Sequence, residues 1–198
     1  MPAGSIILIN GASSAGKTTL VRAFQQIAPV PFVRFSFDLF LDGNALPMDF
    51  IRAHHDGWAQ MRPHVFAGMH QCLHALASTG NNVICDHIIE NTQWRNDLIM
   101  RLHGLDVYLV ALHCSLPELV RREQARGNRN AGEAANDMAV VHRDMHYDLA
   151  LDSEHATTTH NAQQLVDRWL ARHPTERAFP RLTVITLRYT RIYGYDAA

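Results

Sequence analysis

Short apolar runs alternate with amphipathic stretches along most of this chain. Apolar runs bounded by turn residues are typical of buried strands, whereas apolar residues spaced three and four apart indicate helices. The predicted strands are residues 5–10, 32–37, 82–85, 107–113 and 147–151. The predicted helices are residues 17–28, 65–77, 94–102, 117–126, 133–143 and 162–172. This alternation predicts an α/β fold in three layers, with a five-stranded parallel sheet and helices on both faces.

The length of 198 residues suits one domain, which we assign to residues 1–180. Residues 43–63 are mixed and polar, and they predict a long connection that closes over a substrate. Residues 181–198 form a C-terminal extension whose β-branched and aromatic residues favour a strand. An added edge strand, a contact between copies in a homo-oligomer and a disordered tail all remain open for this extension.

A glycine-rich loop follows the first predicted strand and leads into the first predicted helix. Its residues are Gly11, Ala12, Ser13, Ser14, Ala15, Gly16, Lys17, Thr18 and Thr19. A strand, the pattern G-x-x-x-x-G-K-[ST] and a helix, in that order, indicate a phosphate-binding loop. The two glycines allow backbone N–H groups to surround an anion, and the N-terminus of the helix favours the same negative charge. The loop therefore predicts that this protein handles nucleotide phosphates.

Two side chains of this loop have defined roles in the motif. Lys17, the only lysine in the chain, places an ammonium group on the β- and γ-phosphates. Thr18 offers its hydroxyl group to Mg²⁺. ATP and Mg²⁺ are therefore the expected cofactors. The alternative, an incidental lysine in a glycine-rich turn, does not explain why the only lysine lies here.

The composition limits the range of partners. The formal net charge of −1 favours neither a polyanion nor an anionic membrane surface. The chain has no apolar run long enough to cross a membrane and no N-terminal basic segment followed by an apolar stretch. Cys72, Cys85 and Cys114 are widely spaced and fit buried free thiols better than disulfides or a zinc site. We expect a cytoplasmic protein that binds neither nucleic acid nor membrane.

Two acidic residues follow predicted strands at the edge of the sheet where ligands bind. In an open parallel sheet this edge lies beyond the carboxyl ends of the strands. Asp38 follows the second strand and is placed to accept the proton of a substrate hydroxyl that attacks the γ-phosphate. Asp86 ends the third strand and is placed to hold Mg²⁺, directly or through water. The alternatives are a loop-capping role for Asp38 and a turn-forming role for Asp86.

Arginine side chains surround a polar, turn-like segment at residues 127–132. Phosphoryl-transfer enzymes of this shape carry a lid here, which we place at about residues 122–135. Guanidinium groups would stabilise the charge on the transferred group, with Arg122 at the nucleotide and Arg126 and Arg129 in catalysis. A solvated helix end is the alternative.

The thirteen histidines do not form a zinc motif. His70 and His74 share one face of a predicted helix, but Gln71 stands where the H-E-x-x-H pattern requires glutamate. Solvated or buried imidazoles are therefore the expected state of these residues.

Several segments together resemble chloramphenicol phosphotransferase. They are the loop GASSAGKTT, the segment SFDLF around Asp38, the run RREQARGNRNAG at 121–132 and the pattern V-V-H-x₄-Y-D at 140–148. The resemblance spans about residues 6–170 and implies a nucleotide-kinase-like P-loop NTPase fold. It implies ATP-dependent phosphorylation of a small-molecule hydroxyl, as in antibiotic modification, with Asp38 as the base and Arg126 and Arg129 at the phosphates. Where the family has paired acids, this sequence has Asp86 followed by His87.

Other nucleotide-dependent classes require motifs that this sequence lacks. A GTPase-type switch usually carries D-x-x-G and N-K-x-D, and neither pattern occurs. A dinucleotide-binding oxidoreductase requires G-x-G-x-x-G, but position 13 is serine. A small-molecule kinase is the leading interpretation, and a non-catalytic nucleotide sensor and a kinase of an unrelated metabolite are the alternatives.

Overall fold

The structure is a computed structural model that describes residues 2–126 and 132–173. Its centre is a five-stranded sheet in the order β2-β3-β1-β4-β5. All neighbouring strands are parallel. The strands are β1 (Ser5–Asn10), β2 (Val33–Ser36), β3 (Val83–His87), β4 (Asp106–His113) and β5 (Leu149–Asp152). The predicted five-stranded parallel sheet is confirmed.

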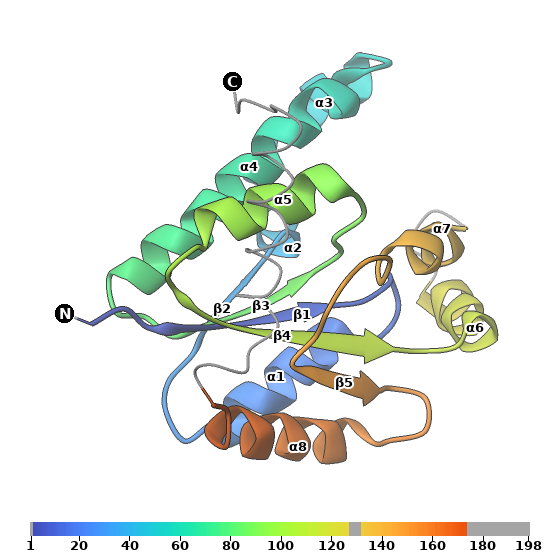
Figure 1. The fold of residues 1–198 in the computed structure, drawn as a ribbon. Helices are drawn as coiled ribbons and strands as arrows, with labels where there is room; N and C mark the ends of the chain where they lie inside the picture. Colours follow the sequence, from blue (N-terminus) through green and yellow to red (C-terminus); the bar gives the residue numbers. More distant parts are fainter. Residues whose placement is uncertain (1, 127–131, 174–198) are drawn as a thin grey trace.

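Strand β1 is apolar along most of its length because both faces of the sheet are covered. Ile6 and Leu8 belong to one buried apolar cluster, and Ile7 and Ile9 belong to the other. The first cluster also contains residues of α4 (Gly57–Ser78) and α5 (Thr92–Arg101). The second contains residues of α1 (Lys17–Ile27) and α8 (Thr158–Leu170). Helices therefore cover both faces, as Figure 1 shows.

Four further helices complete the described structure. They are α2 (Asp38–Asp42), α3 (Met48–Ala53), α6 (Leu116–Arg126) and α7 (Glu133–Val140). In Figure 1, α6 and α7 lie together beyond the carboxyl end of β4. No helix in the described ranges is long and apolar enough to span a membrane.

The segment at residues 43–63 is not the open connection that its polar composition predicts. It contains α3, and α4 already begins at Gly57 and runs through Pro63. Pro63 is exposed, whereas Phe66, which follows it in the same helix, is buried. The packing of this apolar face, which begins at Trp58, outweighs the cost of about 3 kcal/mol for a proline inside a helix.

Three further details differ from the sequence predictions. Strand β2 ends at Ser36, so Asp38 lies in the first turn of α2 rather than at a strand end. Helix α7 ends at Val140, three residues earlier than predicted. Of the three free cysteines only Cys85 is fully buried, and Cys72 is exposed. The centre of the predicted lid, residues 127–131, and the extension at residues 181–198 lie outside the described residues.

Candidate active site

The loop between β1 and α1 has the backbone geometry that its glycines predict. A Cβ atom at Gly11 would lie 2.6 Å from the carbonyl oxygen of Leu112, so no larger residue fits there. Gly16 has a φ of 91°, in the left-handed region that favours glycine, and Ser14 has a φ of 64°. A non-glycine residue in this region is typical of functional turns. Helix α1 begins directly after this turn, at Lys17.

The Lys17 ammonium group is held against the loop. Its Nζ donates hydrogen bonds to the carbonyl oxygens of Gly11 at 2.8 Å and Ala12 at 2.7 Å. The two bonds place the cation inside the curve of the loop, and the side chain lines a cavity beside it. The charge is thus positioned for an anion that the loop would bind.

Thr18 and Asp86 meet across the carboxyl edge of the sheet. The Thr18 hydroxyl donates to Asp86 Oδ2 at 2.6 Å. Asp86 is 6% exposed, and its second oxygen, Oδ1, has no hydrogen-bond partner among the described residues. Ser36, the register partner of Asp86 on β2, also has a buried hydroxyl without a partner in the described ranges. Buried polar atoms without partners are uncommon and indicate a site for an ion, water or ligand.

A first cavity of about 350 Å³ opens on this side of the loop. Lys17, Thr18 and Asp86 line one part of it, and Asp38 enters from α2. The cavity also has an aromatic wall of Phe37, Trp58 and Phe66. Phe37 stacks on Phe66 at 4.9 Å between ring centroids and lies 5.6 Å from Trp58. A carboxylate, a cation and a flat apolar surface therefore face one space.

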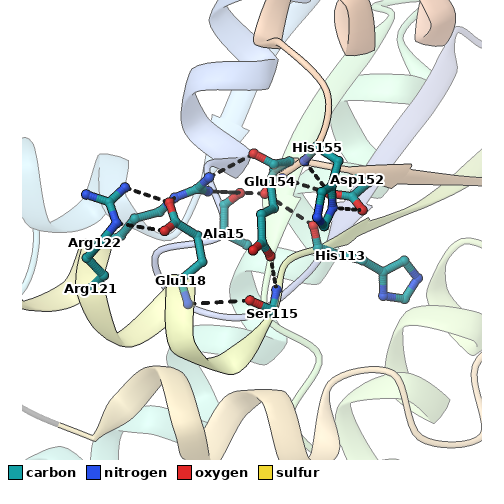
Figure 2. Close-up of polar contacts among 10 residues, drawn as sticks. Ala15, His113, Ser115, Glu118, Arg121, Arg122, Asp152, Glu154 and His155 are labelled. Carbon is teal, nitrogen blue, oxygen red and sulfur yellow. Dashed lines mark hydrogen bonds and ion pairs between the residues drawn. The ribbon is translucent and has the colours of Figure 1, made fainter.

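A second cavity of about 410 Å³ lies on the other side of the loop. Ser14 and Gly16 line both cavities, so the loop separates them. Arg122 forms part of its wall and donates to the Ser153 carbonyl at 2.8 Å and hydroxyl at 3.1 Å. Figure 2 shows Glu118 between the guanidinium groups of Arg121 and Arg122, with bonds of 2.7 Å to each. The network fixes Arg122 against the loop.

Residues 4–170, a span that includes both cavities, match the profile of chloramphenicol phosphotransferase-like proteins. The chain belongs to this family. Two Mycobacterium tuberculosis relatives, from strains CDC 1551 and H37Rv, are named as candidate O-phosphotransferases. Each is 33% identical over an alignment of 202 positions that covers 92% of this chain and 89% of the relative.

Solved kinases share the fold at lower identity. The Mycobacterium tuberculosis APS kinase CysC in complex with AMPPNP and APS is 19% identical, with a TM-score of 0.63 over 86% of this chain and 99% of its own. Shikimate kinase from Acinetobacter baumannii in complex with shikimate is 14% identical, with a TM-score of 0.62 over 85% and 94%. The fold of this chloramphenicol phosphotransferase-like protein is therefore that of the P-loop kinases, and its family supports phosphotransferase chemistry.

In this chloramphenicol phosphotransferase-like protein, the structure brings together most of the site residues that the sequence predicts. Lys17, Thr18, Asp38 and Asp86 line the first cavity, and Arg122 lines the second. Arg126 is the last residue of α6, and its side chain lies outside the described part of the chain. Arg129 lies outside it entirely, so the catalytic roles of both arginines stay predictions.

Sequence reasoning missed several residues of the first cavity. Trp58 and Phe66 come from a helix whose first turns were assigned to a loop. Their spacing of eight residues along one helix face was the available signal. Arg62, between them, forms an ion pair with Glu90 and lies 4.6 Å from the Trp94 ring centroid. Nothing in the local sequence indicates the pair of Arg62 and Glu90, because the two residues are 28 positions apart, on α4 and in the connection after β3.

His87, directly after Asp86, is a buried residue of the same cavity. Its Nδ1 accepts from the Ile88 N–H at 2.8 Å, so we assign the proton to Nε2, which donates to His70 Nε2 at 2.9 Å. His70 Nδ1 then donates to Asp97 at 2.6 Å. Burial lowers the pKa of both histidines, against the opposing effect of Asp97 on His70. The pair is therefore neutral, with both nitrogens of each ring engaged, and supports the Phe66 ring that stacks on His87.

Proposed function

We propose that this protein transfers the γ-phosphoryl group of ATP to a hydroxyl group of a small molecule. The observation that carries the proposal is the position of the phosphate loop between two cavities. One cavity contains a carboxylate beside Lys17, and the other is bounded by the anchored Arg122. A phosphotransferase requires two such sites, one for the nucleotide and one for the acceptor, that meet at the transferred group.

The nucleotide phosphates fit the loop. Its N–H groups and the start of α1 suit an anion, and the buried Ser14 hydroxyl has no partner among the described residues. Residues 11–19 would bind the phosphates, with Lys17 on the β- and γ-phosphates. The nucleoside would occupy the second cavity, beside Arg122 and Ser153.

The residues around Asp86 fit a magnesium ion. Thr18 and Asp86 supply hard oxygen ligands, and the Asp86 Oδ1 atom is buried without a partner within the described ranges. Those ranges hold no cluster of three or more histidine, cysteine or acidic residues suited to a metal. Mg²⁺ commonly takes one or two protein ligands and completes its shell with phosphate oxygens and water. Bound there, it would neutralise charge on the β- and γ-phosphates.

Asp38 is the proposed general base. It lines the same cavity as Lys17, where an acceptor would lie against the γ-phosphate. As the acceptor oxygen forms its bond to phosphorus, its proton passes to the Asp38 carboxylate and the bond from phosphorus to the leaving ADP oxygen breaks. Lys17 then stabilises charge on the transferred group, and we assign the same role to Arg126 and Arg129.

The aromatic wall indicates the kind of acceptor. Phe37, Trp58 and Phe66 offer flat apolar surfaces, which suit an alcohol with a flat or apolar body. Antibiotics with a hydroxyl group and an aromatic ring, chloramphenicol among them, belong to this class and are the first acceptors to examine.

The test is a screen for acceptor-dependent turnover. Purified protein with ATP and Mg²⁺ is incubated with hydroxyl-bearing antibiotics and metabolites, and ADP release is measured above the background without acceptor. Mass spectrometry of each active mixture should find an acceptor heavier by one phosphoryl group. ATP binding without turnover across a broad panel would instead favour the nucleotide sensor.

A further inference from the structure

Helix α7 places a carboxylate directly on the phosphate loop. Asp137 Oδ2 accepts a hydrogen bond of 2.8 Å from the backbone N–H of Ser13. Both residues line the first cavity together with Lys17. In this motif the backbone N–H groups of the loop bind phosphate. One of these groups, the Ser13 N–H, therefore already donates to a carboxylate oxygen.

The helix does not depend on this bond for its position. The buried Glu123 carboxylate of α6 accepts from the N–H groups of Gly132 and Ala134, both at 2.9 Å, at the start of α7. At its other end, Asn10 donates to the Val141 carbonyl at 2.7 Å. Ala134 and Val141 are also fully buried. Substitution of Asp137 should therefore leave α7 in place.

The groups around Asp137 act on its pKa in opposite directions. Burial raises the pKa of Asp137, and the carboxylates of Glu90 and Glu133 act in the same direction. The Ser13 N–H group and the Lys17 ammonium oppose this shift. Lys17 reaches the β- and γ-phosphates in this motif, and Ser13 lines the first cavity with Lys17 and Asp38 but not the second cavity. The terminal phosphoryl group of ATP, on the side of the acceptor, would therefore engage these same two groups. The Asp137 carboxylate would then face a second anion in the same cavity and would lose the stabilising contacts of the Ser13 N–H group and the Lys17 ammonium.

We propose that Asp137 competes with the terminal phosphoryl group of the nucleotide for the Ser13 N–H group, and so sets the ratio of ATP affinity to ADP affinity. The inference rests on the proposed nucleotide site. ADP lacks the terminal phosphoryl group, so the carboxylate weakens the binding of ATP selectively. After transfer, Asp137 returns to Ser13 and takes the position of the group that has left.

The experiment compares a triphosphate with a diphosphate on charge variants of the full chain. The β,γ-imido analogue of ATP and ADP, each with Mg²⁺, are titrated by calorimetry at one neutral pH. Asp137→Asn removes the charge but keeps an oxygen that can accept from Ser13, and Asp137→Ala removes both. Asp144→Asn, at an exposed position just beyond α7, is the matched control for loss of one negative charge.

Asp137→Asn should bind the triphosphate about tenfold more tightly and ADP within twofold of the wild-type protein. Asp137→Ala should also favour the triphosphate, and Asp144→Asn should change neither ligand. Equal changes for both ligands, or no change for either, would overturn the inference, because Asp137 would then only hold α7 on the loop. Weaker triphosphate binding would also overturn it, because a ligand of Mg²⁺ would behave in that way. Failure of the wild-type protein to bind either nucleotide would instead refute the proposed function.

Discussion

The two cavities beside the phosphate loop are built from different kinds of residue. The second has small and polar walls, such as Thr19 and Asn161, and a guanidinium group fixed by its neighbours. The first combines carboxylates with three aromatic rings that come mainly from the segment between β2 and β3. Under the proposed function, nucleotide binding depends on the loop and its immediate contacts, whereas acceptor choice depends on α2 and α4. Substitutions should separate the two functions.

Lys17→Ala should have the largest effect, because we assign to Lys17 the stabilisation of charge on the transferred phosphoryl group. Loss of the only lysine should reduce kcat/KM by about 10³-fold or more, since a preorganised charge stabilises a transition state by several kcal/mol in a dry site. Steady-state ADP release measures this. Circular dichroism should find the variant folded, and a folded variant with wild-type turnover would disprove the phosphate-loop assignment.

Two variants should separate the binding of the acceptor from the binding of ATP. Trp58→Ala should raise the KM of the acceptor about tenfold and leave the KM of ATP within twofold, because the lost contact lies on the acceptor side. Arg122→Gln should do the reverse, because it removes the bonds to Ser153 at the second cavity. Arg22→Gln is the control for the loss of one positive charge, since Arg22 is exposed and lines neither cavity. Parallel changes in both KM values would mean that the cavities are not separate sites.

Two histidines allow a smaller test, of stability against pH. Burial lowers the pKa of His142 to about 4, whereas the bond to Asp152 raises the pKa of the exposed His155. His142 therefore contributes stability that is complete above its usual pKa and is lost as pH falls from about 6.5 towards 4. His155 contributes stability that is present below about 6.5 and is lost as pH rises through its raised pKa.

Denaturant unfolding at pH 5, 6, 7 and 8 would measure both contributions. The wild-type unfolding free energy should fall with acidification because of the buried His142, whose single proton limits this contribution to at most about 1.4 kcal/mol per pH unit. His142→Gln should make this dependence shallower, and His155→Gln should make it steeper. Identical pH profiles for the two variants would contradict the assigned environments.

The sequence predicted the regions whose structure is determined locally. The run Ser5–Asn10 was identifiable as a buried strand, and the glycine positions after it fixed the loop. The sequence prediction failed between β2 and β3, where Pro63 and polar residues concealed the first turns of α4, which are held by tertiary packing of Trp58. It also could not indicate the bond between Asp137 and Ser13, which joins residues far apart in the chain. The phosphate loop was therefore more predictable than the aromatic wall of the first cavity.

The most direct test of the account measures turnover and nucleotide affinity together in Asp38→Asn, with an acceptor from the screen. The substitution keeps the shape of the side chain but cannot accept the proton, so kcat should fall by about 10²- to 10⁴-fold. Calorimetry should find the affinity for Mg²⁺ and ATP near the wild-type value, because the residue acts on the acceptor rather than on the nucleotide. Unchanged turnover, or a matching loss of nucleotide affinity, would contradict the claim that Asp38 is the base of a phosphoryl transfer.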